Sequence, residues 1–311
     1  MSPDRFSDLS NSTSNTVSDR APSPTSPQPV LNLLAEGRHD EAMKAATAAL
    51  MEARNDSTEG DEHAAKLCQA LQALGDVQRE LNQIAEAEAC YREGLELAGD
   101  RQDLSVERAR LRMQLATLLD FNEREADAAP LYELAAADFE ALSPPDDLTA
   151  AQLRNNLAMI YKGLGKFALA EQHYLRSLET IELRMGRNSE SVASVYNNLG
   201  SLYYTAGFPD EAKKMFGEGL AIREKILGPD HPDVAQSLSN IATARHELGD
   251  NVSALLDFER ALRILEGNIQ EKTTSYEAVG SDYISLLEAL NEDRRAEAFR
   301  KRRAKVLSTM E

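Results

Sequence analysis

Residues 155–262 contain one pattern three times: NNLAMIYKGLGKFALAEQHYLRSL from Asn155, NNLGSLYYTAGFPDEAKKMFGEGL from Asn197 and SNIATARHELGDNVSALLDFERAL from Ser239. Successive copies start 42 residues apart. Within each copy, two apolar segments with helical spacing flank a glycine. Self-similarity at a fixed period of this kind indicates a stacked repeat, in which each unit buries its apolar face against its neighbours.

Four columns of the pattern predict that each copy is a helical hairpin. A small residue allows two helices to cross closely, and a glycine suits the left-handed turn, which costs other residues roughly 1–2 kcal/mol. An alanine and an aromatic residue four positions later share one face of the second helix. These columns are Ala158, Gly200 and Ala242; Gly165, Gly207 and Gly249; Ala170, Ala212 and Ala254; and Tyr174, Phe216 and Phe258.

These columns resemble the tetratricopeptide repeat, with Leu157 and Tyr161 in the first helix and Ala170 and Tyr174 in the second. The usual period of that repeat is about 34 residues, whereas the period here is 42. The longer period and the linker LGPDHPDVA from Leu227 resemble the subtype found in kinesin light chains. We therefore predict an all-α fold: a right-handed α-solenoid of stacked antiparallel helix hairpins.

The pattern extends to both sides of the triplicate, with two substitutions in the glycine column. Asn82 tolerates the left-handed turn, whereas Glu123 predicts a different turn that uses Asn122. We predict six hairpins of about 42 residues after a shorter one, together spanning residues 29–308. Their ranges are 29–55 for the short hairpin, then about 64–100, 105–142, 147–185, 189–227, 231–267 and 273–308.

Residues 1–28 are predicted to be a disordered leader, because their Ser, Thr, Asn, Asp and Pro residues bury too little apolar area to offset the ordering entropy. Three sharper hypotheses stay open for the leader. It is a tail phosphorylated at Ser23 and Ser26, a proline-rich ligand or an unconventional export signal.

Composition limits the classes of partner. The 311-residue chain has a formal charge of −18 and a pI of about 4.8, which disfavours binding to nucleic acid or to an acidic membrane surface. It contains no apolar run near the roughly 20 residues that membrane insertion needs. The N-terminal stretch has no apolar signal-peptide core, so we expect a cytoplasmic protein.

The sequence contains no motif for catalysis. A glycine-rich phosphate loop, H-E-x-x-H and G-x-S-x-G are all absent, and the five histidines share no metal-ligand spacing. Cys68 and Cys90 form no redox or metal motif, and we interpret them as two buried thiols on paired helices. We therefore expect a non-enzyme with no cofactor and no metal site.

The family resemblance implies that the first helix of each hairpin lines a concave groove. Asparagine recurs there at Asn156, Asn198 and Asn240, and amides can pair with the backbone of an extended peptide. In kinesin light chains, equivalent asparagines hold cargo peptides, and the resemblance implies the same use here. The alternative is that asparagine is merely a tolerated polar residue. The predicted peptide-binding residues are Asn155, Asn156, Lys162, Asn197, Asn198, Tyr204, Asn240 and His246.

The last copy of the pattern is degenerate and basic. Its aromatic column holds Arg300, its leucine column holds Ala304, and residues 291–311 contain seven basic and four acidic residues. The cations either complement the helix dipole of a capping helix or form a docking patch for an acidic partner, including a second copy. That patch comprises Arg300, Lys301, Arg302 and Arg303.

We predict a non-catalytic scaffold or adaptor that binds a protein or peptide partner in the groove. Self-association is a further expectation from the basic terminal helix. The alternative function is a regulatory or sensory module that acts through assembly, or through autoinhibition by its own tail.

Overall fold

The computed structural model describes residues 28–56 and 60–308, so the predicted leader lies outside the described residues except for Gln28. The described chain forms two compact units, which divide between Ala98 and Gly99. The first unit contains α1 (Gln28–Ala35), α2 (His39–Asn55), α3 (Asp61–Glu80) and α4 (Ile84–Ala98). The second opens with a short 3-10 turn (Gln102–Leu104) and contains α5 (Ser105–Phe121), α6 (Glu125–Ala141), α7 (Asp147–Gly163), α8 (Phe167–Met185), α9 (Glu190–Thr205), α10 (Pro209–Leu227), α11 (Pro232–Glu247), α12 (Asn251–Gly267), α13 (Ile269–Ala289) and α14 (Asp293–Ser308).

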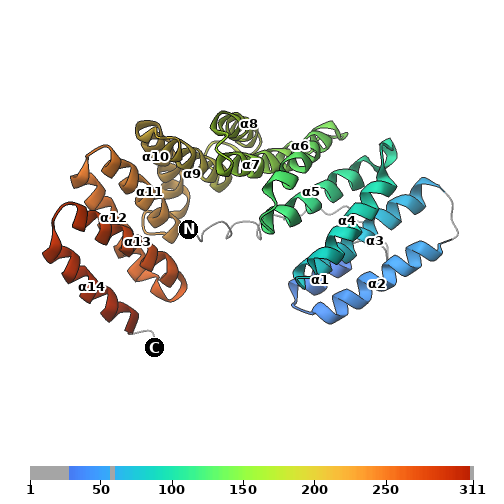
Figure 1. The fold of residues 1–311 in the computed structure, drawn as a ribbon, viewed down its shortest axis with the longest axis horizontal. Helices are drawn as coiled ribbons and strands as arrows, with labels where there is room; N and C mark the ends of the chain where they lie inside the picture. Colours follow the sequence, from blue (N-terminus) through green and yellow to red (C-terminus); the bar gives the residue numbers. More distant parts are fainter. Residues whose placement is uncertain (1–27, 57–59, 309–311) are drawn as a thin grey trace. The chain divides into compact units, whose positions relative to one another are not determined.

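The predicted all-α architecture is confirmed, and no strand occurs in residues 28–56 or 60–308. Within the second unit, α5 to α14 follow one another as antiparallel hairpins (Figure 1). The odd-numbered helices α5 to α13 are the first helices of these hairpins, and the even-numbered ones are the second helices. The second helices α6, α8, α10 and α12 each pack both on their own first helix and on the first helix of the next hairpin. The fold is therefore a solenoid of stacked helix pairs.

The hairpins close because an aromatic ring lies directly on the small-residue column. A Cβ atom at Gly200 would lie 2.4 Å from Cδ1 of Phe216, and one at Gly75 would lie 2.5 Å from Cε1 of Tyr91. Both rings are buried, and Tyr91 also donates a hydrogen bond of 2.7 Å to the buried carboxylate of Asp76. The small residue therefore sets how closely the two helices approach.

The backbone is left-handed at the positions of the glycine column, and the prediction for the turn at Glu123 needs correction. Gly207 has φ +85°, as the pattern predicts, but Glu123 is also left-handed at φ +59°. The prediction of a different turn that uses Asn122 is wrong, because Asn122 has φ −101° and precedes the left-handed residue. The backbone N–H groups of Glu123 and Arg124 bond to the carbonyls of Asp120 and Leu119, the same closing pattern that Gly207 and Phe208 make. Hydrogen bonding at the helix end thus selects this conformation even for glutamate.

Replacing Glu123 with glycine is expected to raise the free energy of unfolding by roughly 1 kcal/mol, because glycine carries little left-handed penalty. Chemical denaturation followed by circular dichroism would measure the change. Glu179→Gly is the matched control. Its position is exposed within α8, where glycine should cost about 1 kcal/mol relative to a good helix former. Destabilisation by both substitutions would contradict the assigned turn.

The terminal hairpin also differs from the sequence pattern. The 42-residue period puts Arg300 in the aromatic column, but Phe299 takes the buried position one residue earlier. Its ring meets those of Tyr276 and Tyr283 edge-on, with centroids 6.4 and 5.1 Å apart. A Cβ atom at Gly280 would lie 3.2 Å from Cε1 of Phe299, so a close small-to-aromatic contact is kept in this hairpin. The one-residue shift preserves an apolar hairpin core.

Candidate functional site

All eight predicted peptide-binding residues lie on three consecutive first helices. Every one of these side chains is half-buried. They are Asn155, Asn156 and Lys162 on α7; Asn197, Asn198 and Tyr204 on α9; and Asn240 and His246 on α11. Half-burial leaves part of each side chain accessible while neighbouring helices restrict the rest.

The asparagines pair with one another between hairpins. Nδ2 of Asn198 donates to Oδ1 of Asn155 over 3.0 Å, which joins α9 to α7. Nδ2 of Asn240 donates to Oδ1 of Asn197 over 2.6 Å, which joins α11 to α9. We call this set, together with Asn156, the amide row. The amides therefore link successive repeats, a use that the sequence reasoning did not anticipate.

The amide row keeps hydrogen-bonding capacity beyond these links. An asparagine side chain has two N–H donors and an oxygen with two lone pairs, and each link uses one group per residue. Asn156 takes part in neither link and lies near the Tyr132 hydroxyl of the preceding second helix, α6. The row thus has fixed geometry and unused donors and acceptors.

The predicted column at the far end of the first helices also bridges repeats. Nζ of Lys162 donates to Oγ of Ser201 on α9 over 2.9 Å. The Tyr204 hydroxyl donates to Oε1 of Glu247 on α11 over 3.2 Å. Burial and the nearby Glu247 carboxylate raise the pKa of Tyr204, so its hydroxyl stays protonated at neutral pH. This column thus positions a cation and a phenol by contacts between helices.

The third member of that column bonds within its own hairpin. Nδ1 of His246 lies 2.7 Å from Oδ1 of Asn251, the first residue of α12. Because an amide oxygen only accepts, Nδ1 carries the proton, and Nε2 of a neutral ring is then the acceptor. Sequence reasoning missed Glu247 and Asn251 as partners, since nothing in a linear column shows which neighbouring side chains reach it.

The fifteen positions that the repeat pattern assigns to the groove-facing side of α7, α9 and α11 are mostly polar, and Lys162 is the only lysine or arginine among them. The chain has 52 acidic residues, yet none of the fifteen positions assigned to this face is acidic. They are Gln152, Asn155, Asn156, Met159, Lys162, Ser194, Asn197, Asn198, Ser201, Tyr204, Gln236, Ser239, Asn240, Thr243 and His246. Ser239 is 4% exposed, so it contributes to the core rather than to an accessible surface.

The predicted basic docking patch on α14 is largely tied to the second unit. Arg300 pairs with Glu288 on α13, and Arg302 pairs with Glu266 on α12. Arg295 adds a second pair between α14 and α12, with Glu259 at 3.0 Å. These arginines therefore attach the terminal helix to the preceding ones.

The other two residues of that patch differ in orientation. Nη1 of Arg303 donates to Oγ of Ser281 on α13 over 3.1 Å, so this side chain lies against α13. Lys301 lies 76% exposed and pairs with Glu297 of its own helix at 3.4 Å. Lys301 is thus the member of the predicted patch that faces away from the chain.

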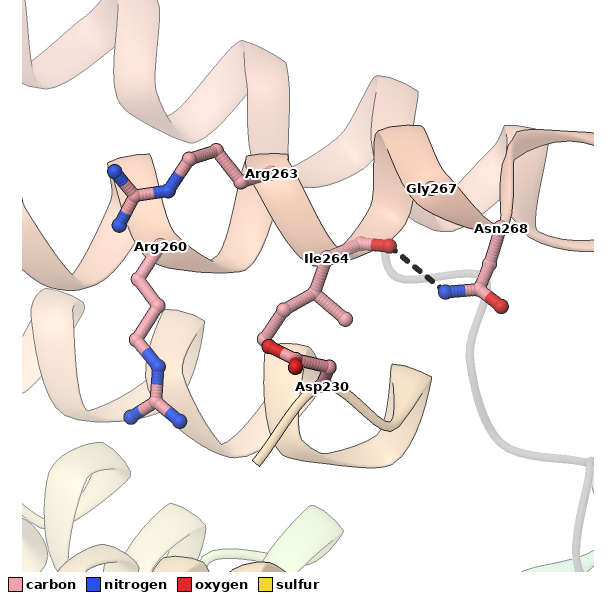
Figure 2. Close-up of a pocket in the computed structure, with 6 residues that line it drawn as sticks. All are labelled: Asp230, Arg260, Arg263, Ile264, Gly267 and Asn268. Carbon is pink, nitrogen blue, oxygen red and sulfur yellow. Dashed lines mark hydrogen bonds between the residues drawn. The ribbon is translucent and has the colours of Figure 1, made fainter. Parts of the chain in front are cut away.

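A pocket of about 340 Å³ lies at the C-terminal end of α12. Figure 2 shows Asn268 bonded to the Ile264 carbonyl, with Asp230 contributed by the loop before α11. Arg260 is already engaged, because it pairs with Glu224 at 2.6 Å and donates to the Pro229 carbonyl at 2.9 Å. This pocket therefore lies where α12 contacts the linker that precedes α11.

None of the helices in the described residues has the length and apolar character that a membrane span requires. No group of three or more His, Cys, Asp or Glu side chains in residues 28–56 and 60–308 could hold a metal ion.

Family models match parts of both units. Models described as tetratricopeptide repeat match residues 149–225, 191–267 and 69–101. Among curated proteins, the Arabidopsis thaliana Protein KINESIN LIGHT CHAIN-RELATED 1 is 28% identical over 256 residues, which is 81% of this chain. This chain spans only 41% of the length of that relative.

Solved structures agree with these matches. BtubC (BKLC) from P. vanneervenii is 34% identical and superposes with a TM-score of 0.61, covering 73% of this chain and 90% of its own. The apo form of RapI has a TM-score of 0.69 over 91% of this chain and 76% of its own, and at 12% identity it shows the fold alone. The chain belongs to the tetratricopeptide-repeat family, with 42-residue repeats of the kinesin-light-chain type.

Proposed function

We propose that the protein is a non-catalytic scaffold or adaptor that binds a partner protein through an extended peptide segment. The binding face comprises the amide row together with Lys162, Tyr204 and His246 on α7, α9 and α11. Families of this repeat type commonly serve as protein-interaction scaffolds and are typically non-catalytic. The observation that carries the proposal is an amide row held in place by its own links between repeats.

Preorganisation supports this face as the site. Ordering a mobile side chain on binding costs about 0.5–1.5 kcal/mol. Asn155 and Asn197 are already fixed by Asn198 and Asn240, so much of that cost is met before a partner arrives. The donors and acceptors that these links leave free suit a peptide backbone, which presents one N–H and one carbonyl for each non-proline residue.

Charge also favours a peptide over a highly charged ligand. The binding face is nearly neutral in a chain of charge −18. A neutral polar face allows an uncharged backbone to approach without desolvating carboxylates, which is costly unless they are paired. Lys162, Tyr204 and His246 add distinct groups at one edge, where they would contact side chains of the partner and supply specificity.

Changing Asn156, Asn198 and Asn240 together to alanine is expected to weaken peptide binding more than tenfold, about 1.4 kcal/mol. Peptides would be selected from a displayed random library on the wild-type protein, and their affinities would be measured by calorimetry. Each lost link between repeats should also cost about 0.5–1.5 kcal/mol of stability. Binding is therefore measured well below the denaturation midpoint of the variant.

The matched control changes Gln172, Lys214 and Arg263 to alanine. These exposed side chains lie on α8, α10 and α12 of the same three hairpins. The control should bind the selected peptides with wild-type affinity. Equal affinity in the amide variant and the wild type would show that this face is not the binding site.

A further inference from the structure

The outward face of α14 carries a stripe of three cations. Arg294, Lys301 and Lys305 lie within one narrow arc, because a helix turns about 100° per residue. They lie on the side opposite Ala296 and Phe299, which are buried against the hairpin. The stripe therefore points away from the body of the second unit.

The stripe is not neutralised by the rest of the unit. Arg294 and Lys305 are exposed and form no ion pair with any described residue. Lys301 meets only the exposed Glu297 of its own turn, and such surface pairs contribute about 0–1 kcal/mol. The arginines that do attach α14 to the chain lie on other faces of the helix. These three cations therefore do not hold α14 against the other described helices.

A column of glutamates also distinguishes α14 from the earlier second helices. Second helices carry a glutamate every 42 residues: Glu140, Glu182, Glu224 and Glu266. Each accepts a bond from the hairpin that follows, as Glu140 does from Arg154, Glu224 from Arg260 and Glu266 from Arg302. The next position in the column is Ser308 on α14. The terminal helix therefore lacks the carboxylate that would receive another hairpin of this type.

Corresponding positions on the other second helices show no such stripe. Taken 42 residues apart, the columns of Arg294, Ala298, Lys301 and Lys305 hold at most one cation on each earlier helix of the second unit. They are Ala126, Pro130, Glu133 and Ala137 on α6; Ala168, Gln172, Leu175 and Glu179 on α8; Asp210, Lys214, Gly217 and Ala221 on α10; and Val252, Leu256, Glu259 and Arg263 on α12. The concentration of cations is thus confined to the last helix.

We propose that the outward stripe of Arg294, Lys301 and Lys305 docks on the acidic surface of a second copy of this chain. Helix α14 holds seven basic and two acidic residues in a chain whose formal charge is −18. Every copy therefore carries both the cationic stripe and a large excess of carboxylates elsewhere.

The contact is weak and sensitive to salt. Three exposed cations gain at most about 1 kcal/mol each from ion pairs, and salt near 0.15 M screens charges beyond about 8 Å. Opposite charge speeds the encounter and selects the orientation more than it adds affinity. Self-association therefore depends on protein concentration and is strongest at low ionic strength.

Sedimentation velocity of the full chain tests the proposal over a concentration series, in salt of roughly 0.05 M and roughly 0.3 M. The wild type is expected to gain mass with concentration at the lower salt and to become monomeric at the higher salt. Arg294→Glu, Lys301→Glu and Lys305→Glu, introduced together, should weaken the association at least tenfold. Circular dichroism would establish that this variant keeps its helices.

The control carries Lys44→Glu, Lys214→Glu and Lys225→Glu, which change the net charge by the same amount on exposed side chains of other helices. It should associate at least as strongly as the wild type. A wild type that stays monomeric at low salt would overturn the proposal, because no second copy then docks. Equal weakening in the variant and the control would also overturn it, by reducing the effect to general repulsion.

Discussion

Replacing Phe216 with alanine is expected to lower the free energy of unfolding by about 3–5 kcal/mol, the usual cost of removing a buried aromatic ring. The ring is 4% exposed and lies on Gly200 in the hairpin of α9 and α10. It belongs to a small cluster with Ala212, Ile241 and Ala244, so it also joins this hairpin to α11. Its loss should therefore leave a cavity between two repeats as well as within one.

Phe208→Ala is the matched control for this substitution. Phe208 caps the start of the same helix, α10, but is 54% exposed. Surface substitutions usually change stability by about 0.5 kcal/mol or less. Denaturation would be monitored by circular dichroism and by hydrogen exchange, because a repeat array need not unfold in one step. Similar losses for the two phenylalanines would contradict the assigned core.

Replacing Gly200 with leucine is expected to cost about 3 kcal/mol, at the upper end of what overpacking usually costs. A Cβ atom alone would lie 2.4 and 2.5 Å from two carbons of the Phe216 ring, closer than real Cβ contacts. Alanine stands in the same column at Ala158 and Ala242, so a ring can move aside for one methyl group. A leucine side chain needs far more room, and the helices must then separate.

Gly217→Leu, at the residue that follows Phe216 on α10, is expected to have the opposite effect. A Cβ atom at Gly217 would meet nothing within 4 Å, and glycine inside a helix is about 0.8–1.0 kcal/mol less favourable than alanine. This substitution should therefore stabilise the protein by up to about 1 kcal/mol. The difference in denaturation midpoint between the two leucine variants is the measurement, and equal destabilisation would refute the close approach at Gly200.

The amide row shows how far sequence reasoning reached toward the site. The period placed Asn156, Asn198 and Asn240 on equivalent positions of first helices, and the structure keeps them half-buried there. The period could not show that Asn198 and Asn240 donate to asparagines of the preceding repeat. Those bonds depend on the offset between neighbouring helices, which packing of the buried side chains sets and a linear pattern does not record.

The same limit applies to the orientation of the cations on α14. Its basic composition was evident, but composition does not distinguish Arg302, which reaches Glu266, from Lys301, which faces outward. Helical geometry separates the two only after the buried face of α14 is known. That face is set by Phe299, one residue away from the position that the aromatic column indicated.

The sequence by itself determined the helical hairpins, their order and most of their turns. These features are local, because helix periodicity, a close-crossing small residue and a left-handed cap act within one repeat. Only the tertiary structure decided that Glu123 takes the left-handed cap, that amides link the repeats and which cations of α14 face outward. Each of these outcomes depends on which groups neighbouring helices bring within bonding distance, a relation between segments that no single segment encodes.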